Sequence, residues 1–200
     1  MSPGATFERV YHELKARLGS GRYAAGQHLE PAALSQDLMS SITPVRDALH
    51  RLVGEGLVEA PRGDGFRTPL VTELGLRHLY RWNATLLDLA ARQGGVRPSD
   101  ITDPGDAADP LARTERLFLA IAARPGNPEH LAAVARLGER LRPVRRVELE
   151  LLADLEAEAA ALAERLAADA AGPLRRSLSL YHRRRERLAA EIVAAIHKAA

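Results

Sequence analysis

Glycines and prolines divide the first third of the chain into short segments, each with one apolar stripe. Apolar residues recur at helical spacing in residues 6–18 and again in residues 31–38, which predicts two amphipathic helices. A third helix is expected to begin at Thr43-Pro44, where Ser40 or Ser41 can cap its free N–H groups. The resulting order is helix, helix, turn, helix.

A β-hairpin is predicted directly after the third helix. Gly54 and Gly56 end that helix, and residues 57–60 and 66–68 have the pattern of two short strands joined by the glycine-rich turn 61–65. We therefore expect residues 1–70 to form a winged helix-turn-helix of three helices plus a β-hairpin wing, an architecture that binds DNA.

The remaining residues, 71–200, show helical patterns and no strand pattern. Residues 96–109 are read as a loop, one helix is expected to kink at Pro143 and continue to residue 171, and a last helix should cover residues 174–198. Amphipathic helices of this length must bury their stripes against one another, so the region is predicted to be an all-α bundle and the fold class mainly α. The residues expected to cap helices here are Thr72, Asp109 and Asn127.

Composition limits the class of protein further. The chain has no cysteine, no signal-peptide pattern and no apolar run long enough to span a membrane, so a cytoplasmic protein without membrane contacts is expected. Its formal net charge is +2, and the residues up to Pro69 include eight basic and eight acidic side chains. DNA affinity would therefore depend on where individual arginines point.

Residues 10–68 resemble the DNA-binding domain of the GntR family in three ordered blocks. The first block is Gly21-Arg22 followed by Gly26 and Leu29, the second is the run Ser-Ile-Thr-Pro-Val-Arg-Asp-Ala-Leu at 41–49, and the third is Leu-Val-Gly-Glu-Gly-Leu-Val at 52–58. The helical remainder is similar in layout to the FadR-type, or FCD, effector domain. The resemblance implies a bacterial transcription regulator.

By this resemblance, the third helix is the recognition helix and the hairpin tip contacts the adjacent minor groove or backbone. Hydroxyls and free N–H groups at a helix N-terminus bind phosphates, and an arginine can donate two hydrogen bonds to guanine. Arg46 is expected to be the leading base or phosphate contact. The residues assigned to DNA are Ser41, Thr43, Pro44, Arg46, Arg51, Arg62 and Gly63.

The recognition helix departs from the family pattern at one position. Ile42 stands where the family has an arginine that reads a base. An isoleucine can offer only apolar contact, for example to a thymine methyl group. DNA binding is still expected, but not at the family's usual operator sequence.

FadR-type domains commonly hold a metal ion through Asp-x-x-x-His and two later histidines. Here Glu115 replaces the aspartate, Leu119 replaces the first histidine, and only His182 matches the last. Since leucine cannot bind a metal, no metal and no other cofactor is expected. A family arginine that contacts the effector corresponds to Asn83. The effector residues assigned by resemblance are Asn83, Glu115 and His182, around a pocket that is apolar and metal-free unless the domain binds no effector.

For several residues of the helical region, a purely structural role is also predicted. His182 is expected at the surface, and the arginines of 183–187 are expected to form a solvated face that pairs with the acidic helix 148–164. Trp82, the only tryptophan, is assigned to the core or to a dimer contact.

These readings predict a homodimeric regulator, most simply a repressor, that binds a palindromic operator and responds to a small-molecule metabolite. The alternative keeps the winged helix but makes the bundle a docking or dimerisation module for proteins, with no effector. An enzyme is not expected, because the sequence shows no nucleophile with a paired base and no phosphate-binding glycine loop.

Overall fold

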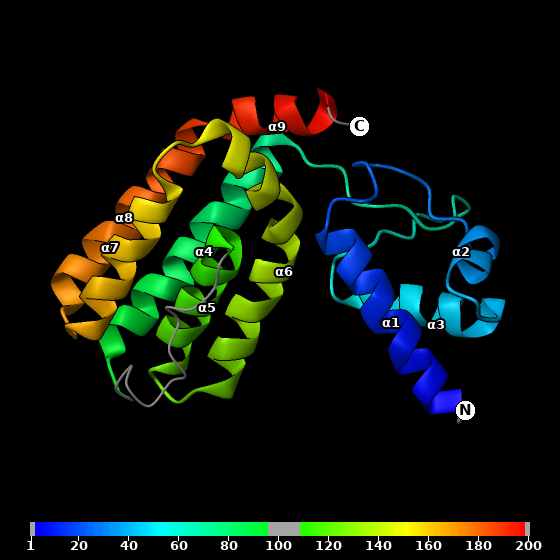
Figure 1. Ribbon diagram of the computed structural model, residues 1–200, viewed down its shortest axis with the longest axis horizontal. Helices are drawn as coiled ribbons and strands as arrows, with labels where there is room; N and C mark the ends of the chain where they lie inside the picture. The colour runs from blue at the N-terminus through cyan, green and yellow to red at the C-terminus, as the bar shows by residue number, and fades with distance from the viewer. Residues whose placement is uncertain (1–2, 96–108, 199–200) are drawn as a thin grey trace. The chain divides into compact units, whose positions relative to one another are not determined.

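The computed structural model describes residues 3–95 and 109–198. It is mainly helical, as the sequence predicts. Two compact units divide the chain, the first made of Met1–Val71 with Ala194–Ala200 and the second of Thr72–Val193 (Figure 1). Of the predicted loop 96–109, residues 96–108 lie outside the described part of the chain.

Three helices build the first unit: α1 (Pro3–Gly19), α2 (Pro31–Asp37) and α3 (Ile42–Gly54). Helix α3 packs against both α1 and α2, so the predicted order of helices is confirmed. Their apolar stripes close over one core, because side chains three and four positions apart lie on the same helix face. That core includes Val10, Leu14, Leu34, Val45, Leu49 and Leu52.

The predicted hairpin strands do not form as strands in the described residues. Glu59 and Arg67 exchange two backbone hydrogen bonds, of 2.8 and 2.9 Å, and Arg67 also forms a bridge with His28. Pro61 has no N–H group and Gly63 and Gly65 have positive φ angles, so the backbone turns away after a single pair of bonds. The wing is therefore a tight loop that is closed by one bridge and anchored by the buried Phe66.

Helices of the second unit lie side by side as a bundle (Figure 1). Helix α4 packs against α5, α6 and α8, and α7 packs against α5 and α8. The predicted N-caps are confirmed: the side chains of Thr72, Asp109 and Asn127 each accept a hydrogen bond from a backbone N–H of the first turn. The helices of this unit are α4 (Glu73–Gln93), α5 (Pro110–Ala123), α6 (Pro128–Leu151), α7 (Leu155–Ala167) and α8 (Ala171–Arg187). The last helix, α9 (Ala189–Lys198), begins in this unit, and its residues from Ala194 onward belong to the first unit.

Three predicted helix boundaries were wrong. Helix α6 continues through Pro143 and ends at Leu151, where the sequence had suggested one helix up to residue 171. Gly172-Pro173 begins α8 instead of ending the preceding helix, which suits a proline in a first helical turn. The last predicted helix is divided at Leu188. None of the helices in the described ranges is both long and apolar enough to cross a membrane.

Candidate functional site

The two faces of α3 differ sharply in exposure. Val45, Ala48, Leu49 and Leu52 are buried against the other two helices of the unit. Ser41, Thr43 and Arg46 are exposed on the opposite side, and Pro44 is half-buried. This pattern presents the first turns of α3 to solvent while the rest of the helix is held by the core.

The exposed N-terminus of α3 has unpaired groups that suit phosphate binding. Ser41 is the N-cap in extended conformation, yet its hydroxyl makes no capping hydrogen bond. The first N–H groups of a helix have no intrahelical partner and carry the positive end of its dipole. Within the described residues, Arg46 forms no ion pair or hydrogen bond. The serine hydroxyl, the N–H groups and the guanidinium can therefore all bind an external partner.

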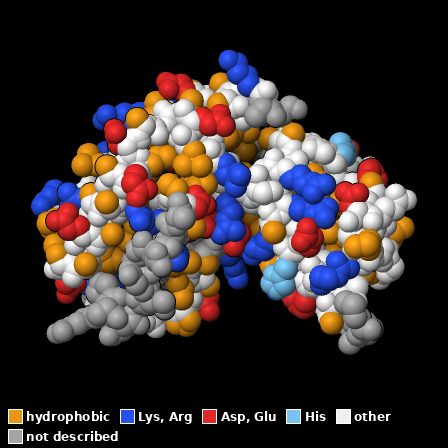
Figure 2. All heavy atoms as spheres, in the orientation of Figure 1, with side chains coloured by type: hydrophobic (Ala, Val, Ile, Leu, Met, Phe, Trp, Pro, Cys, Tyr) orange, Lys and Arg blue, Asp and Glu red, His pale blue; other side chains and the backbone are white. Residues whose placement is uncertain are grey.

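The wing places its predicted residues at the tip of the loop. Arg62 and Gly63 are exposed, and Gly63 has a φ angle of 80°, a conformation that favours glycine. Asp64 donates a backbone hydrogen bond of 3.2 Å to Pro61, which closes the turn around them. On the face of this unit drawn in Figure 2, basic side chains alternate with acidic ones, in keeping with its balanced charge.

Arg51, also predicted to bind DNA, is held by contacts within the domain. Its guanidinium carbon lies 3.8 Å from the centre of the Tyr11 ring, and its Nη1 lies 3.2 Å from a carboxylate oxygen of Glu8. A second ion pair, of 3.5 Å, joins it to Glu55. These contacts hold α3 to α1, so we expect Arg51 to support the fold of the domain.

Met39 is an exposed residue that sequence reasoning missed. It lies in the turn before α3 with a φ angle of 47° and is 90% exposed. Ile42, the first residue of α3, is 46% exposed. Two large apolar side chains are thus exposed beside the residues predicted to bind DNA. The sequence contained a signal for this exposure: Met39 and Ile42 are apolar, yet neither falls on the buried stripe of a predicted helix.

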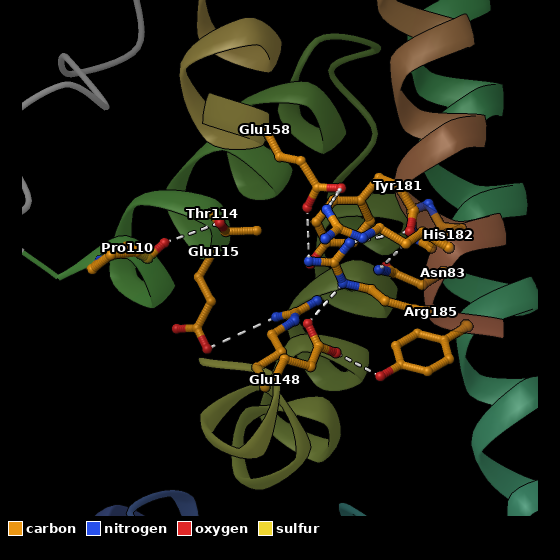
Figure 3. Close-up of polar contacts among 12 residues, drawn as sticks. Asn83, Pro110, Thr114, Glu115, Glu148, Glu158, Tyr181, His182 and Arg185 are labelled. Atoms are coloured by element: carbon orange, nitrogen blue, oxygen red, sulfur yellow. Dashed lines mark hydrogen bonds and ion pairs between the residues drawn. The ribbon is translucent and has the colours of Figure 1, made fainter. Parts of the chain in front are cut away.

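Of the predicted effector residues, Asn83 and His182 lie together. The Asn83 amide nitrogen is 3.2 Å from His182 Nε2, and His182 Nδ1 is 2.7 Å from the Leu178 carbonyl oxygen (Figure 3). The amide donates to Nε2, so Nδ1 carries the ring proton and donates to the carbonyl. His182 is 1% exposed, and its predicted surface position was therefore wrong. Trp82 is 52% exposed, so of its two predicted positions, the core and a dimer contact, the core is wrong and the dimer contact stays a prediction.

Glu115 is held elsewhere, by an arginine of the next helix. Arg142 donates to its two carboxylate oxygens from Nε at 3.0 Å and Nη2 at 2.5 Å. Among the described residues, Glu115 forms no hydrogen bond or ion pair with Asn83 or His182, so the structure brings together two of the three predicted effector residues.

These side chains do not fit the metal site of FadR-type domains. His182 Nε2 is already hydrogen-bonded to Asn83, and the Glu115 carboxylate is already bonded to Arg142. Leu119 has no atom that can coordinate a metal. Throughout residues 3–95 and 109–198, no three His, Asp or Glu side chains gather in a way that could hold a metal ion. The charges nearest His182 are the guanidinium groups of Arg185 and Arg145, which would repel a cation.

A buried network of hydrogen bonds and ion pairs fills the bundle interior beside His182 (Figure 3). Arg185 donates to Glu148 at 2.7 Å and to Glu158 at 3.0 Å, and Tyr80 donates to the other Glu148 oxygen at 2.5 Å. Burial and the Glu148 carboxylate raise the pKa of Tyr80, which keeps its hydroxyl a donor. Arg185 is 0% exposed. The arginine run was expected to be solvated and to pair with the acidic helix; the pairing is present, but Arg185 is buried.

We expect His182 to make folding sensitive to acid. The pKa of His182 is lowered to about 3, chiefly by burial and also by the charges of Arg185 and Arg145, against the opposing effect of the hydrogen bond to Leu178. The unfolded chain takes up this proton near pH 6.5, so the unfolding free energy should fall as the pH drops from about 6.5 toward 3. The loss approaches about 1.4 kcal/mol per pH unit.

The variant His182→Gln should lack this part of the pH dependence. Urea unfolding between pH 7.5 and pH 4.5 should show the wild type losing about 2 to 3 kcal/mol more than the variant. Carboxylates common to both proteins cancel in the difference. Parallel curves would mean that His182 is already protonated in the folded state.

The fold and the exposed α3 define a helix-turn-helix DNA-binding protein. Residues 6–67 match the family described as bacterial regulatory proteins, gntR family. The chain is 28% identical over 153 residues to the HTH-type transcriptional regulator McbR of Escherichia coli (strain K12), which covers 68% of each protein. Residues 6–67 therefore form a DNA-binding domain of the gntR family, and the chain is similar to a transcription regulator over 68% of its length.

Solved structures show the same fold over nearly the whole chain. The structure described as E. coli McbR/YncC has a TM-score of 0.70 at 24% identity, covering 93% of this chain and 97% of that one. A putative GntR transcriptional regulator from Rhodococcus sp. RHA1 has a TM-score of 0.75 at 18% identity, covering 96% and 99%. The helical second unit therefore has a counterpart in both structures.

Proposed function

We propose that this chain is a homodimeric repressor that binds a palindromic operator through α3 and the wing and is regulated by a small molecule in its FCD-type helical domain. The observation that carries the proposal is the free N-terminus of α3, where Ser41, Thr43 and Arg46 face solvent. Supporting contacts come from Arg62 and Gly63 at the wing tip. A twofold protein reads a twofold sequence, so each α3 would occupy one half-site.

Exposed apolar side chains of the second unit support a dimer. Trp82 and Leu89 lie seven residues apart on α4, one helix face, and are 52% and 43% exposed; Leu180 on α8 is 66% exposed. Helix α4 packs against α8. A contiguous exposed apolar patch commonly marks an interaction surface, and we propose that a second copy of the chain covers these side chains of α4 and α8.

The proposal is tested by selecting fragments of the source genome with the purified chain and footprinting those that bind. Light scattering of the free protein should give the mass of a dimer, and protected regions should contain inverted repeats. A transcription assay on a selected fragment should show less transcript when the protein is added. A monomer that protects single, unrepeated sites would overturn the homodimer and its palindrome.

The alternative function is a bundle that docks another protein and binds no small molecule. The observation in its favour is that the predicted effector residues Asn83, Glu115 and His182 are already engaged by partners within the chain. Thermal unfolding with a panel of metabolites separates the two, since a ligand of the folded state raises its stability. A metabolite that raises the Tm would favour the small-molecule sensor over the docking module.

Ile42 should make the regulator sensitive to a thymine methyl group. Its exposed side chain begins α3, where it can contact the major groove, and the methyl is the group that thymine presents there and uracil lacks. Replacing thymines of a selected operator by uracil, one at a time, should weaken binding at one position per half-site, roughly 2- to 10-fold. Ile42→Ala should show the same Kd on both DNAs. If wild type binds the uracil DNAs unchanged at every position, Ile42 reads no methyl.

A further inference from the structure

The turn between α2 and α3 (Figure 1) contains Met39 in a backbone conformation that favours glycine. The Ser40 N–H donates to the Ser35 carbonyl at 2.9 Å, and the Met39 N–H donates to the Gln36 carbonyl at 3.1 Å. These two bonds end α2 in a Schellman motif, in which the residue after the C-cap Leu38 is left-handed. Met39 meets this requirement with a φ angle of 47°, and a residue with a Cβ loses folding free energy there.

The cost at Met39 is not offset by burial, because its side chain is 90% exposed. Asp169 is the other non-glycine residue with a positive φ angle among those that the structure describes. Its carboxylate pairs with Arg124, and aspartate tolerates this conformation better than most residues. Met39 instead combines a strained backbone with an exposed apolar side chain. Strained residues of this kind are concentrated at functional sites.

The turn that carries Met39 is fixed by the rest of the domain. Arg9 of α1 donates from Nη2 to the Leu38 carbonyl at 2.9 Å, and the Leu38 side chain is buried in the core. Three residues after Met39, α3 begins with the half-exposed Ile42. Met39 is therefore presented from a rigid turn directly before the helix that is proposed to enter the major groove.

We propose that Met39 is an operator-contacting residue that packs against an apolar group of the DNA. The groove and its backbone offer two such groups, the thymine methyl and the carbon face of the deoxyribose. A methionine side chain suits either one, because it is uncharged, flexible and polarisable. The contact would remove the exposed side chain from water. It belongs to the proposed operator recognition and rests on that function.

The test compares variants of the full chain on an operator selected from genomic fragments. Met39→Ala keeps the strained backbone and removes the side chain, so the Kd should rise roughly 3- to 10-fold. Met39→Gly should weaken binding to the same extent, yet the amides of α3 should exchange with solvent about 2- to 10-fold more slowly, because the strain is relieved. Met39→Leu restores the apolar bulk and should bind within about twofold of the wild type.

Leu70→Ala is the matched control for these variants. Leu70 is another large apolar residue of the first unit, 51% exposed, and its truncation should leave the Kd unchanged. Wild-type affinity in both Met39→Ala and Met39→Gly overturns the contact. A loss confined to Met39→Gly also overturns it, because backbone flexibility and not the side chain would then be the cause. Failure of the proposed function is distinct, since the wild type would then select no operator.

Operators with uracil in place of single thymines distinguish the two apolar groups. If Met39 packs on a thymine methyl, substitution at one position per half-site should weaken the wild type and leave Met39→Ala unaffected. That position should differ from the one at which Ile42→Ala is unaffected. If Met39 packs on a deoxyribose, Met39→Ala should bind every substituted DNA more weakly than the wild type, by the same factor.

Discussion

Arg46→Ala is expected to weaken binding to a selected operator by roughly 10- to 100-fold, the equivalent of about 1 to 3 kcal/mol for a lost arginine contact to a base. The side chain is exposed on α3 and forms no ion pair or hydrogen bond within the described residues. Its removal should therefore leave the fold intact. Fluorescence anisotropy with a labelled operator gives the Kd, and the urea midpoint should match that of the wild type.

Arg51→Ala is the matched control on the same helix. Its guanidinium stacks on Tyr11 and pairs with Glu8 and Glu55, so truncation should lower the stability of the domain and leave operator affinity nearly unchanged. The two variants should thus separate binding from folding. If Arg51→Ala loses the operator as fully as Arg46→Ala while remaining folded, the recognition surface extends along the whole helix.

The three-helix domain could be predicted because its sequence and its packing agree. Val45, Leu49 and Leu52 recur at helical spacing, and all three are buried. Short interruptions by glycine mark the turns, and the polar residues between the apolar positions face solvent. Arg46 could be assigned to the outer face by the same periodicity, since it follows the buried Val45 by one position.

The wing could be predicted as a turn but not as strands. The glycines of this segment indicate where the chain reverses, because the turn requires a positive φ angle, which Gly63 adopts. Strand pairing depends on how many backbone bonds form beyond the turn, and here Pro61 and the glycines limit the ladder to Glu59 and Arg67. The strand preferences of individual residues do not predict how many of these backbone hydrogen bonds form.

The interior of the bundle was the least predictable part, because charged residues are buried there. A run of arginines suggests a solvated face, yet Arg185 follows Tyr181 by four positions and Leu178 by seven on the buried side of α8. Arg145 and Glu148 likewise follow Leu141 by four and seven positions on α6. Helical spacing placed all three on the apolar stripe. Composition alone suggests solvated positions for these charged residues, so spacing is the better guide to their burial.

The buried pair of Arg185 and Glu148 leads to the largest expected effect on stability. Arg185→Met should lower the unfolding free energy by about 3 to 5 kcal/mol, because Glu148 is then left as a buried charge without its partner. Glu148 is 1% exposed, and the Tyr80 hydroxyl that remains beside it carries no charge. Urea unfolding followed by circular dichroism measures the loss.

An exposed pair of similar length provides the control. Arg81 and Glu186 are 2.8 Å apart, against 2.7 Å for Arg185 and Glu148, but the Arg81 side chain is 60% exposed. Arg81→Met should cost less than about 1 kcal/mol, since water solvates the remaining carboxylate. Adding Glu148→Gln to Arg185→Met should recover part of the loss, because glutamine is neutral and its oxygen can still accept from Tyr80. If the double variant is no more stable than Arg185→Met alone, the loss comes from side-chain packing and not from the uncompensated charge.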